Sequence, residues 1–249
     1  MINKLILGTV QFGLNYGINN TIGKLDKVEV FKLLKIAYNK GIRFLDTAEL
    51  YGDAHEIIGD YHKKNYNNKF RVITKFPNNI EINRTEDKVL KYLEILDIKS
   101  ISVIMFHSFD SFKSNYKVLK LLNELKKNGI IDNIGVSVYT NSQLENLLNE
   151  DLISVVQLPF NLLDNLNFRG DLLYKLKIKG KSIHTRSVFL QGLFFKKIND
   201  QTPIVQKLKN ELKFLNKLIT QSNCSMEELA LSYSLNQENI DNVIIGVDS

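Results

Sequence analysis

The chain has 249 residues, of which 44% are hydrophobic and 24% are charged, a balance typical of a globular protein with one large core. No apolar run approaches the roughly 18 residues that would cross a membrane, and the N-terminal MINKLILGTVQFG reads as a strand rather than a signal peptide. The single Cys224 excludes an internal disulfide and a cysteine-based metal site. We therefore expect no membrane partner and a reducing, cytoplasmic location.

The formal net charge is +6. Lysines lie at helix-face spacing in NELKKNG and KLKNELKFLNKL, and no arginine-rich run is present. Solvated helix faces explain this pattern better than a nucleic-acid surface does. We expect no nucleic-acid partner, while a basic cavity mouth for a phosphorylated cofactor stays compatible with the charge.

Apolar runs and helical patterns alternate along the whole chain. The expected strands are LILGTV (5–10), IRFLD (42–46), VITKF (72–76), SVIMFH (102–107), NIGVSV (133–138), SVVQLPF (154–160), SIHTRS (182–187) and NVIIGV (242–247). Helical spacing predicts helices over 27–40, 54–61, 85–96 with Thr85 as N-cap, 116–128, 142–150, 170–180, 205–220 and 226–236.

Eight strands that alternate with helices predict a parallel sheet with crossover helices. Eight units in about 250 residues match the size of a closed (β/α)8 barrel. The competing open, doubly wound sheet lacks its GxGxxG fingerprint after the first strand. We therefore predict the α/β class, with residues 1–249 forming a single (β/α)8 TIM barrel domain.

Three consecutive expected strands carry an ionisable residue at the C-terminal end. Asp46 ends the second strand, Lys75 lies near the end of the third, and His107 ends the fourth. Neighbouring strands lie about 4.8 Å apart, so these groups should converge at one end of the barrel. Tyr51 follows Asp46 by five residues and can reach the same place from the loop.

These four residue types together suit proton transfer. A phenol is a poor acid at neutral pH, but a nearby ammonium stabilises the phenolate, and a carboxylate keeps the ammonium charged. An imidazole can hydrogen-bond a carbonyl oxygen as negative charge develops on it. No nucleophile accompanies the set, so a hydride from a nicotinamide would complete a carbonyl reduction.

The motifs FLDTAELYG, ITKF and MFH at these intervals resemble the aldo-keto reductase family, and the similarity extends from the first strand to the eighth. The resemblance implies an NAD(P)-dependent reductase that converts an aldehyde or ketone to an alcohol. It assigns Tyr51 as general acid/base, Lys75 and Asp46 as its tuning pair, and His107 as the group that orients the carbonyl.

The same resemblance implies a set of cofactor-binding residues. Ser137 and Gln157 match the residues that hold the nicotinamide carboxamide, while Val138 stands where the family has Asn. Arg186 replaces an aromatic residue that stacks on the nicotinamide, and a planar guanidinium can also stack. The remaining expected contacts, mostly in the loop after the seventh strand, are Ser187, Leu190, Gln191, Gly192 and Gly246.

In the family a segment after the eighth strand binds the adenosine 2′-phosphate and leads to a final helix. Here the sequence ends at Ser249, so we expect the eighth outer helix to be missing. An uncovered barrel flank would favour oligomerisation. NADP is the cofactor that the family implies, with NAD as the alternative.

Two other classes of function are compatible with parts of this pattern. A metal-dependent barrel hydrolase would use His55, His107, His184, Asp46 and Glu49 as ligands, although the His-x-His motif of such enzymes is absent after the first strand. We expect no metal. A nucleotide-binding barrel without catalysis, acting as a sensor or a subunit, is the second alternative.

The expected rim loops are QFGLNYGINNTIG, HSFDSFKSN and NLLDNLNFRG. They are rich in Asn and Ser with interspersed Phe and Tyr, and Lys113 and Arg169 are available in them. Polar groups with aromatic platforms favour a sugar or sugar derivative as the small-molecule carbonyl substrate.

Overall fold

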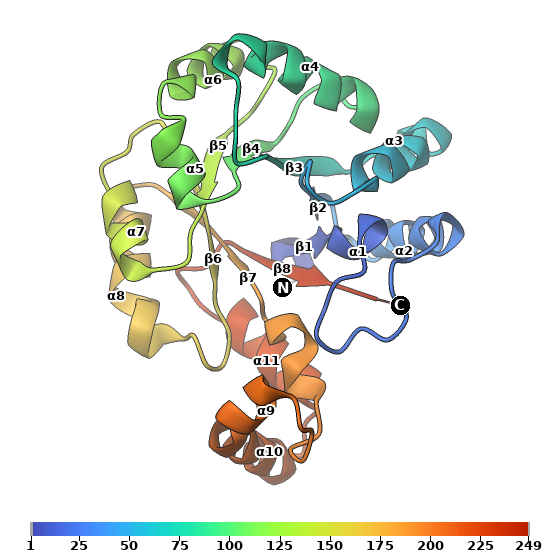
Figure 1. Ribbon diagram of the computed structural model, residues 1–249, viewed down its shortest axis with the longest axis vertical. Helices are drawn as coiled ribbons and strands as arrows, with labels where there is room; N and C mark the ends of the chain where they lie inside the picture. Colours follow the sequence, from blue (N-terminus) through green and yellow to red (C-terminus); the bar gives the residue numbers. More distant parts are fainter. Residues whose placement is uncertain (1, 249) are drawn as a thin grey trace.

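The computed structural model describes residues 2–248, so the ends of the predicted domain at Met1 and Ser249 lie outside the described residues. Eight parallel strands pair in chain order and close into a barrel (Figure 1). The strands are β1 (Leu5–Gly8), β2 (Phe44–Asp46), β3 (Arg71–Phe76), β4 (Val103–Phe106), β5 (Ile134–Ser137), β6 (Val155–Pro159), β7 (Ser182–Arg186) and β8 (Asn242–Gly246). The predicted (β/α)8 fold is confirmed.

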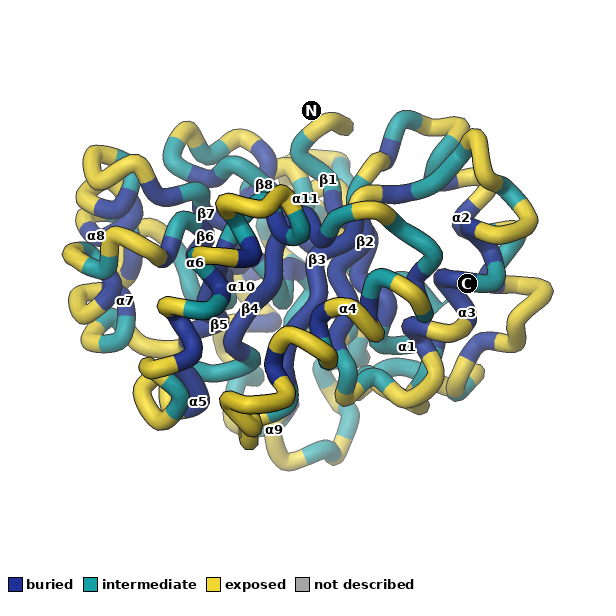
Figure 2. The backbone as a smooth tube through the Cα atoms, turned by 90° about the horizontal axis from the view of Figure 1, so that it is seen from above, coloured by how far each residue is buried: buried dark blue, intermediate teal, exposed yellow. Residues whose placement is uncertain are grey.

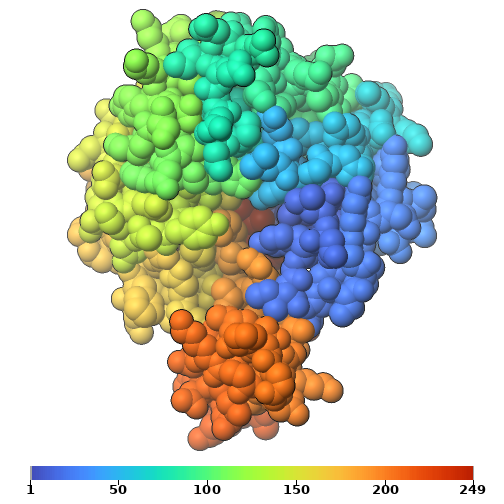
Figure 3. Space-filling model, viewed as in Figure 1, coloured from blue at the N-terminus to red at the C-terminus, as the bar shows by residue number. Residues whose placement is uncertain are grey.

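Helices surround the barrel, and one group of them extends beyond it. The α-helices are α1 (Val10–Gly13), α2 (Lys27–Asn39), α3 (Ala54–Lys64), α4 (Thr85–Leu96), α5 (Phe109–Ser114), α6 (Val118–Lys127), α7 (Asn141–Leu147), α8 (Leu166–Ile178), α9 (Pro203–Lys207), α10 (Lys209–Ser222) and α11 (Met226–Leu235). Short 3-10 helices cover Ile2–Lys4, Tyr66–Asn68, Ile82–Arg84 and Leu190–Phe195. Helices α9 and α10 form the orange lobe that projects from the barrel in Figure 3.

Side chains alternate between the two faces of each strand, as the pleat requires. The inner faces meet in a small apolar cluster inside the barrel, made by Ile6, Ile73, Val103, Met105, Val155 and Ile244. The outer faces pack under the helices in a much larger core. Buried residues therefore concentrate in the strands, and exposed residues lie mostly on the outer helices and loops (Figure 2).

Several helix boundaries follow from capping residues in the sequence. The Asp26 carboxylate accepts hydrogen bonds from the Val28 and Glu29 amides, which begins α2 at the predicted residue. Thr140 and Ser225 each form a capping box with the residue three positions later, which fixes the starts of α7 and α11.

The structure corrects three local predictions. Thr85 is the first residue of α4 rather than its N-cap, because its hydroxyl donates to the Glu81 carbonyl of the preceding 3-10 turn. The loop after β4 contains α5, capped by Ser108, whose side chain accepts from the Ser111 amide. The helix predicted over 205–220 is two helices, α9 and α10, which are separated at Leu208.

After β8 the structure describes only Val247 and Asp248, so the expected oligomerisation through an uncovered flank stays a prediction. Across residues 2–248, none of the helices combines the length and apolar character that a bilayer crossing requires.

Candidate active site

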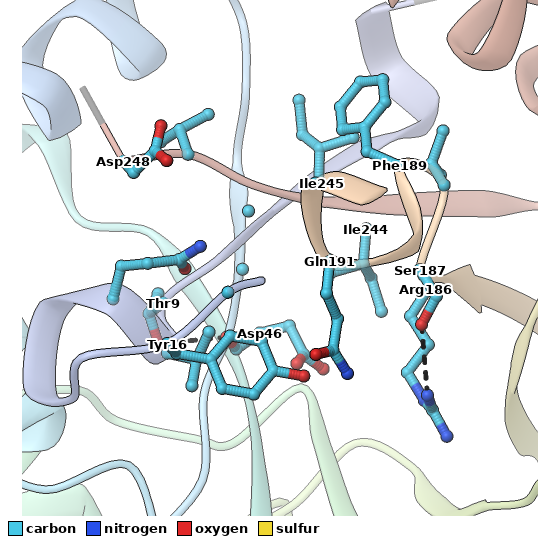
Figure 4. Close-up of a pocket in the computed structure, with 18 of the residues that line it drawn as sticks. Thr9, Tyr16, Asp46, Arg186, Ser187, Phe189, Gln191, Ile244, Ile245 and Asp248 are labelled. Carbon is cyan, nitrogen blue, oxygen red and sulfur yellow. Dashed lines mark hydrogen bonds between the residues drawn. The ribbon is translucent and has the colours of Figure 1, made fainter. Parts of the chain in front are cut away.

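A cavity of about 830 Å³ opens at the C-terminal ends of the strands. Every strand except β4 contributes residues to it, together with the segments that follow β1, β2, β4, β5, β7 and β8, and with α11 (Figure 4). Asp46, Tyr51, Lys75 and His107 all line it, so the four residues that the sequence predicts as catalytic share one cavity. A hollow is visible near the centre of the corresponding face in Figure 3.

Strand register explains why these side chains converge. Asp46 is paired with Ile73, and Lys75, two residues further along β3, is paired with Met105. His107 lies two residues beyond Met105 and directly follows β4. The three groups therefore have the same inward orientation at successive heights of a staggered barrel.

Asp46 and Lys75 form a buried ion pair at the floor of the cavity. The Lys75 Nζ donates to Asp46 Oδ1 at 2.5 Å and to the Thr47 carbonyl at 3.0 Å. Only 1% of Lys75 and 4% of Asp46 are exposed to solvent. Burial alone would lower the pKa of Lys75, but the Asp46 carboxylate and the Tyr51 hydroxyl raise it, so the ammonium stays charged.

Tyr51 reaches this pair from the loop between β2 and α3. The Lys75 Nζ lies 5.2 Å from the centre of the Tyr51 ring, and the His107 ring centre lies 5.9 Å from it in an edge-on arrangement. The loop packs tightly on α1, because a Cβ at Gly13 would come within 1.7 Å of the Tyr51 carbonyl oxygen. Gly52 adopts a φ of +56° against Gly13. These two glycines were not among the predicted site residues, although Gly52 directly follows Tyr51.

A network on the outer side of the sheet also holds the Tyr51 loop. The Glu49 carboxylate accepts from Lys88 Nζ at 2.8 Å and from the Tyr92 hydroxyl, both on α4. The Glu49 amide donates to the Lys75 carbonyl at 3.2 Å. The sequence reasoning missed this anchor, since contacts between a loop and a distant helix leave no local pattern.

His107 is uncharged at neutral pH. Burial lowers its pKa to about 4, and the nearby Lys75 charge acts in the same direction against the opposing effect of Asp46. Its buried Nδ1 has no hydrogen-bond partner within residues 2–248. A neutral imidazole still carries one N–H donor, which suits it to hydrogen-bond a carbonyl oxygen.

Gln157, predicted as a cofactor-binding residue, also has a hydrogen bond within the site. Its Nε2 donates to Asp46 Oδ2 at 2.8 Å, so the amide holds the second oxygen of the carboxylate that pairs with Lys75. Gln157 is 1% exposed and also borders the cavity. Gln157 thus extends the ion pair across the barrel from β3 to β6.

The side chains named for the alternative metal site do not gather. His55 Nε2 hydrogen-bonds Thr74 Oγ1 at 2.8 Å and its ring packs edge-on against Tyr92, outside the barrel. Glu49 is bonded to Lys88, as described above, while His184 points into the barrel interior next to Gln157 in the strand register. No three His, Cys, Asp or Glu side chains in the described part of the chain form a group suited to a metal ion.

The loop after β7 forms the opposite wall of the cavity. Ser187, Leu190 and Gln191 have φ values of 64°, 47° and 57°, a run of left-handed backbone that is costly for residues with a Cβ. Gly192 follows at 85°, and a Cβ there would lie 2.7 Å from the Asn19 Cβ. The Gln191 carbonyl accepts from the Ile18 amide at 2.8 Å, which ties this loop to the loop after β1.

Most predicted cofactor residues line the cavity: Ser137, Gln157, Arg186, Ser187, Gln191, Gly192 and Gly246. Leu190 does not, whereas its neighbour Phe189 does, although both side chains pack against the hydrophobic core. Val138 is fully buried in the same core. The Arg186 guanidinium lies over the Tyr139 ring, 4.3 Å from its centre, a distance suited to a cation–π contact.

The two cations expected at the substrate rim are not cavity residues. Arg169 is 7% exposed and forms a bidentate ion pair with Asp164, with further bonds to Asn141 Oδ1 and the Tyr139 carbonyl. Its guanidinium stabilises the loop between β6 and α8. Lys113 lies on α5, outside the cavity lining, with its Nζ over the Phe109 ring.

A family model described as the aldo/keto reductase family matches residues 4–249 of this chain. Among solved structures, an aldo-keto reductase from Bacillus halodurans in its holo form, AKR11C1, has a TM-score of 0.80 at 20% identity, covering 99% of this chain and 82% of that one. The glycerol dehydrogenase AKR11B4 from Gluconobacter oxydans has a TM-score of 0.75 at 20% identity, covering 98% and 82%.

Curated relatives are distant. The norsolorinic acid reductase of Aspergillus flavus is 27% identical over 154 residues, which are 55% of this chain and 39% of that protein. The uncharacterized oxidoreductase YqkF of Bacillus subtilis is 24% identical over 228 residues, covering 86% of this chain and 74% of that protein. The match to norsolorinic acid reductase thus spans less than half the length of that relative.

Proposed function

The chain belongs to the aldo/keto reductase family, and on that premise we propose that it is a nicotinamide-dependent reductase that converts a carbonyl to an alcohol. The observation that carries the proposal is the placement of Asp46, Tyr51, Lys75 and His107 around one cavity, with the lysine charged and the imidazole neutral. The names of the curated relatives, among them norsolorinic acid reductase, support the same reaction class.

Each of the four residues has a distinct part in the proposed reaction. His107 and Tyr51 hydrogen-bond the carbonyl oxygen and polarise it. Tyr51 gives its proton to that oxygen, and the Lys75 charge stabilises the phenolate that remains. Asp46 keeps Lys75 charged and in place, and Gln157 holds Asp46. Solvent then returns a proton to Tyr51.

The cavity wall suits a dinucleotide, whose reduced nicotinamide would supply the hydride. Four glycines, Gly8, Gly17, Gly192 and Gly246, border the cavity and let a ligand approach the backbone closely. The Gln11 Oε1 is buried without a partner within residues 2–248, so it can accept a hydrogen bond from a bound molecule. The family implies NADP as this cofactor, with NAD as the alternative.

We assign the cofactor-facing roles to the residues that line the cavity. The Arg186 guanidinium lies over the Tyr139 ring and would also stack on the nicotinamide ring. Ser137 would bind the carboxamide. The loop after β7 would hold the pyrophosphate through Ser187, Gln191 and Gly192, with Phe189 in the place first given to Leu190.

For the substrate we propose a sugar or a sugar derivative. Tyr16, Asn19 and Tyr139 line the outer part of the cavity and supply aromatic faces and an amide. We also place the enzyme in the cytoplasm, since a single cysteine fits a reducing compartment. Reduction of apolar aldehydes alone, with no reduction of aldoses or keto-sugars, would contradict the choice of substrate class.

The direct test is a panel of carbonyl compounds, from glyceraldehyde to aldoses, keto-sugars and benzaldehydes, assayed by the loss of NADH or NADPH absorbance. We expect turnover with at least one compound and its loss in Tyr51→Phe, with cofactor binding retained. Cofactor binding without any turnover would instead support the nucleotide-binding barrel without catalysis.

A further inference from the structure

Glu49 lies between Asp46 and Tyr51 in the sequence, but it does not line the active-site cavity. It lines a second cavity, of about 480 Å³, whose other lining residues lie in or beside α3 and α4. These two helices lie next to each other on the outside of the barrel (Figure 1). Any effect of the Glu49 side chain on the reaction must therefore act through the loop that carries Tyr51.

The Glu49 carboxylate is bound by two residues of α4. It accepts from the Tyr92 hydroxyl, and Lys88 Nζ donates to both of its oxygens at 2.8 Å. Tyr92 is only 3% exposed, and burial and the Glu49 carboxylate both raise its pKa, so the hydroxyl stays protonated and donates. The Lys88 and Glu49 side chains are 29% and 33% exposed, so water screens their ion pair. Tyr92 is therefore the stronger of the two anchors.

The Tyr92 anchor is itself well fixed, because α4 packs closely on its neighbours. A Cβ at Gly59 of α3 would lie 1.8 Å from the Ile95 carbonyl oxygen, so the two helix backbones meet at a distance that only glycine allows. The Tyr92 ring also lies against β3, with its centre 6.1 Å from that of the Phe76 ring. A bond from the loop to Tyr92 thus joins the loop to both α4 and the barrel.

The backbone of Glu49 ties the same loop to β3. Its amide donates to the Lys75 carbonyl at 3.2 Å, and Lys75 Nζ donates to the Thr47 carbonyl at 3.0 Å. The Tyr51 amide donates to the Ala48 carbonyl at 3.0 Å, which closes the turn that carries the phenol. Glu49 therefore lies where α4, β3 and the turn that carries Tyr51 are joined.

We infer that Glu49 is a positioning residue for Tyr51, and that Tyr92 and Lys88 act on the reaction through it. The inference rests on the proposed function, since it gives this network a part in proton transfer from Tyr51. A general acid must lie within hydrogen-bond reach of its acceptor, and a displacement of about 1 Å can slow a reaction by about 100-fold. Release of Glu49 from α4 lets the turn and its phenol shift, while the wall formed by β7 and β8 keeps its place.

The first test measures kcat, KM and cofactor affinity for variants of the full chain, with the best carbonyl compound of the panel. Glu49→Ala should lower kcat by about 10- to 100-fold and leave the Kd of NADH and NADPH nearly unchanged. Glu49→Gln should lose less, because its amide oxygen still accepts a hydrogen bond. The matched control is Glu56→Ala, which removes an exposed carboxylate from the same second cavity and should leave kcat unchanged.

A double-variant cycle tests whether Tyr92 acts through Glu49. Tyr92→Phe removes only the hydroxyl, and by itself it should lower kcat by less than Glu49→Ala does. In a Glu49→Ala background it should have no further effect, because the hydrogen bond is already lost. Losses that multiply in the double variant would overturn the assignment of Tyr92.

Hydrogen exchange of the loop amides, at residues 47–54, gives a readout that needs no turnover. Glu49→Ala should speed exchange there, and Glu56→Ala should not. Unchanged kcat or unchanged exchange in Glu49→Ala would overturn the inference, as would equal losses of kcat and cofactor affinity, which indicate a general loss of structure. Absence of turnover in the wild-type protein would contradict the proposed function, and exchange would then decide separately whether Glu49 holds the loop.

Discussion

The wall of the cavity formed by β2 to β4 differs from the wall formed by β7, β8 and their loops. On the first wall, Asp46 and Lys75 are buried strand residues with their charges paired and their orientation set by register. On the second, the loop from Ser187 to Gly192 contains four residues with positive φ, and Glu227 and Asp248 line the same cavity. The buried ion pair thus lies on rigid strands, while the left-handed backbone of the second wall lies in a loop.

The largest effect should come from removing the proposed proton donor on the first wall. We expect Tyr51→Phe to lower kcat for carbonyl reduction by about 10²- to 10⁴-fold, because a positioned acid contributes an effect of that size. Tyr16→Phe is the matched control, since it removes another phenol that lines the same cavity. Equal losses in both variants would show that Tyr51 has no special part in proton transfer.

The buried ion pair should also matter for stability. Lys75→Met leaves the Asp46 carboxylate buried and unpaired, and we expect it to lower the free energy of unfolding by about 3–5 kcal/mol. Lys24→Met breaks the exposed pair with Asp53, whose side chain is 49% exposed, and should cost about 0–1 kcal/mol. Urea denaturation measures both. A double variant, Lys75→Met with Asp46→Asn, should recover part of the loss.

On the second wall, the effect of a single methyl group depends on its surroundings. Gly192→Ala and Gly129→Ala both place a Cβ at positive φ, which costs about 1–2 kcal/mol. At Gly129 the added Cβ meets nothing within 4 Å, whereas at Gly192 it meets the Asn19 Cβ. We expect Gly192→Ala to lose more stability and to weaken binding of NADPH and NADH, which Gly129→Ala should leave unchanged. Similar NADH affinities in the two variants would remove this loop from the cofactor site.

A smaller effect, the dependence of stability on pH, should come from one buried histidine on each side of the barrel. Burial lowers the pKa of His107 on the first wall and of His184 on the second from 6.5 to about 4. Between these two values the unfolded chain binds protons that the folded chain does not, so stability should fall as pH drops from about 6.5 toward 4. Thermal unfolding followed across this range measures the loss. His184→Met should make the pH dependence shallower, and an unchanged slope would contradict the burial of a neutral imidazole.

The first wall was predictable from the sequence because each of its strands ends in a recognisable local pattern. IRFLD, VITKF and SVIMFH are short apolar runs with an ionisable residue at the end, and parallel strands bring such ends together without knowledge of tertiary contacts. The placement of Asp46, Lys75 and His107 in one cavity follows from the fold once the alternation is recognised.

The second wall was less predictable because its geometry depends on backbone conformation and on contacts between distant segments. The sequence predicts Leu190 as a cavity residue, but its neighbour Phe189 lines the cavity in a loop where Ser187, Leu190 and Gln191 have positive φ. The sequence alone does not show that Arg169 has a partner, and only the fold reveals its ion pair with Asp164. The hydrogen bond between Gln157 and Asp46 joins residues 111 positions apart in the sequence. Local sequence patterns do not predict a contact over such a separation.

The central claim, that Tyr51 protonates a carbonyl while hydride arrives from a nicotinamide, has one direct test. Reduced cofactor labelled with deuterium at the transferred position is incubated with the protein and the best carbonyl compound of the panel, and the alcohol is analysed by mass spectrometry. The account predicts one deuterium on the former carbonyl carbon, with the label absent when Tyr51→Phe is used. An alcohol formed without deuterium, or full transfer of deuterium by Tyr51→Phe, would contradict it.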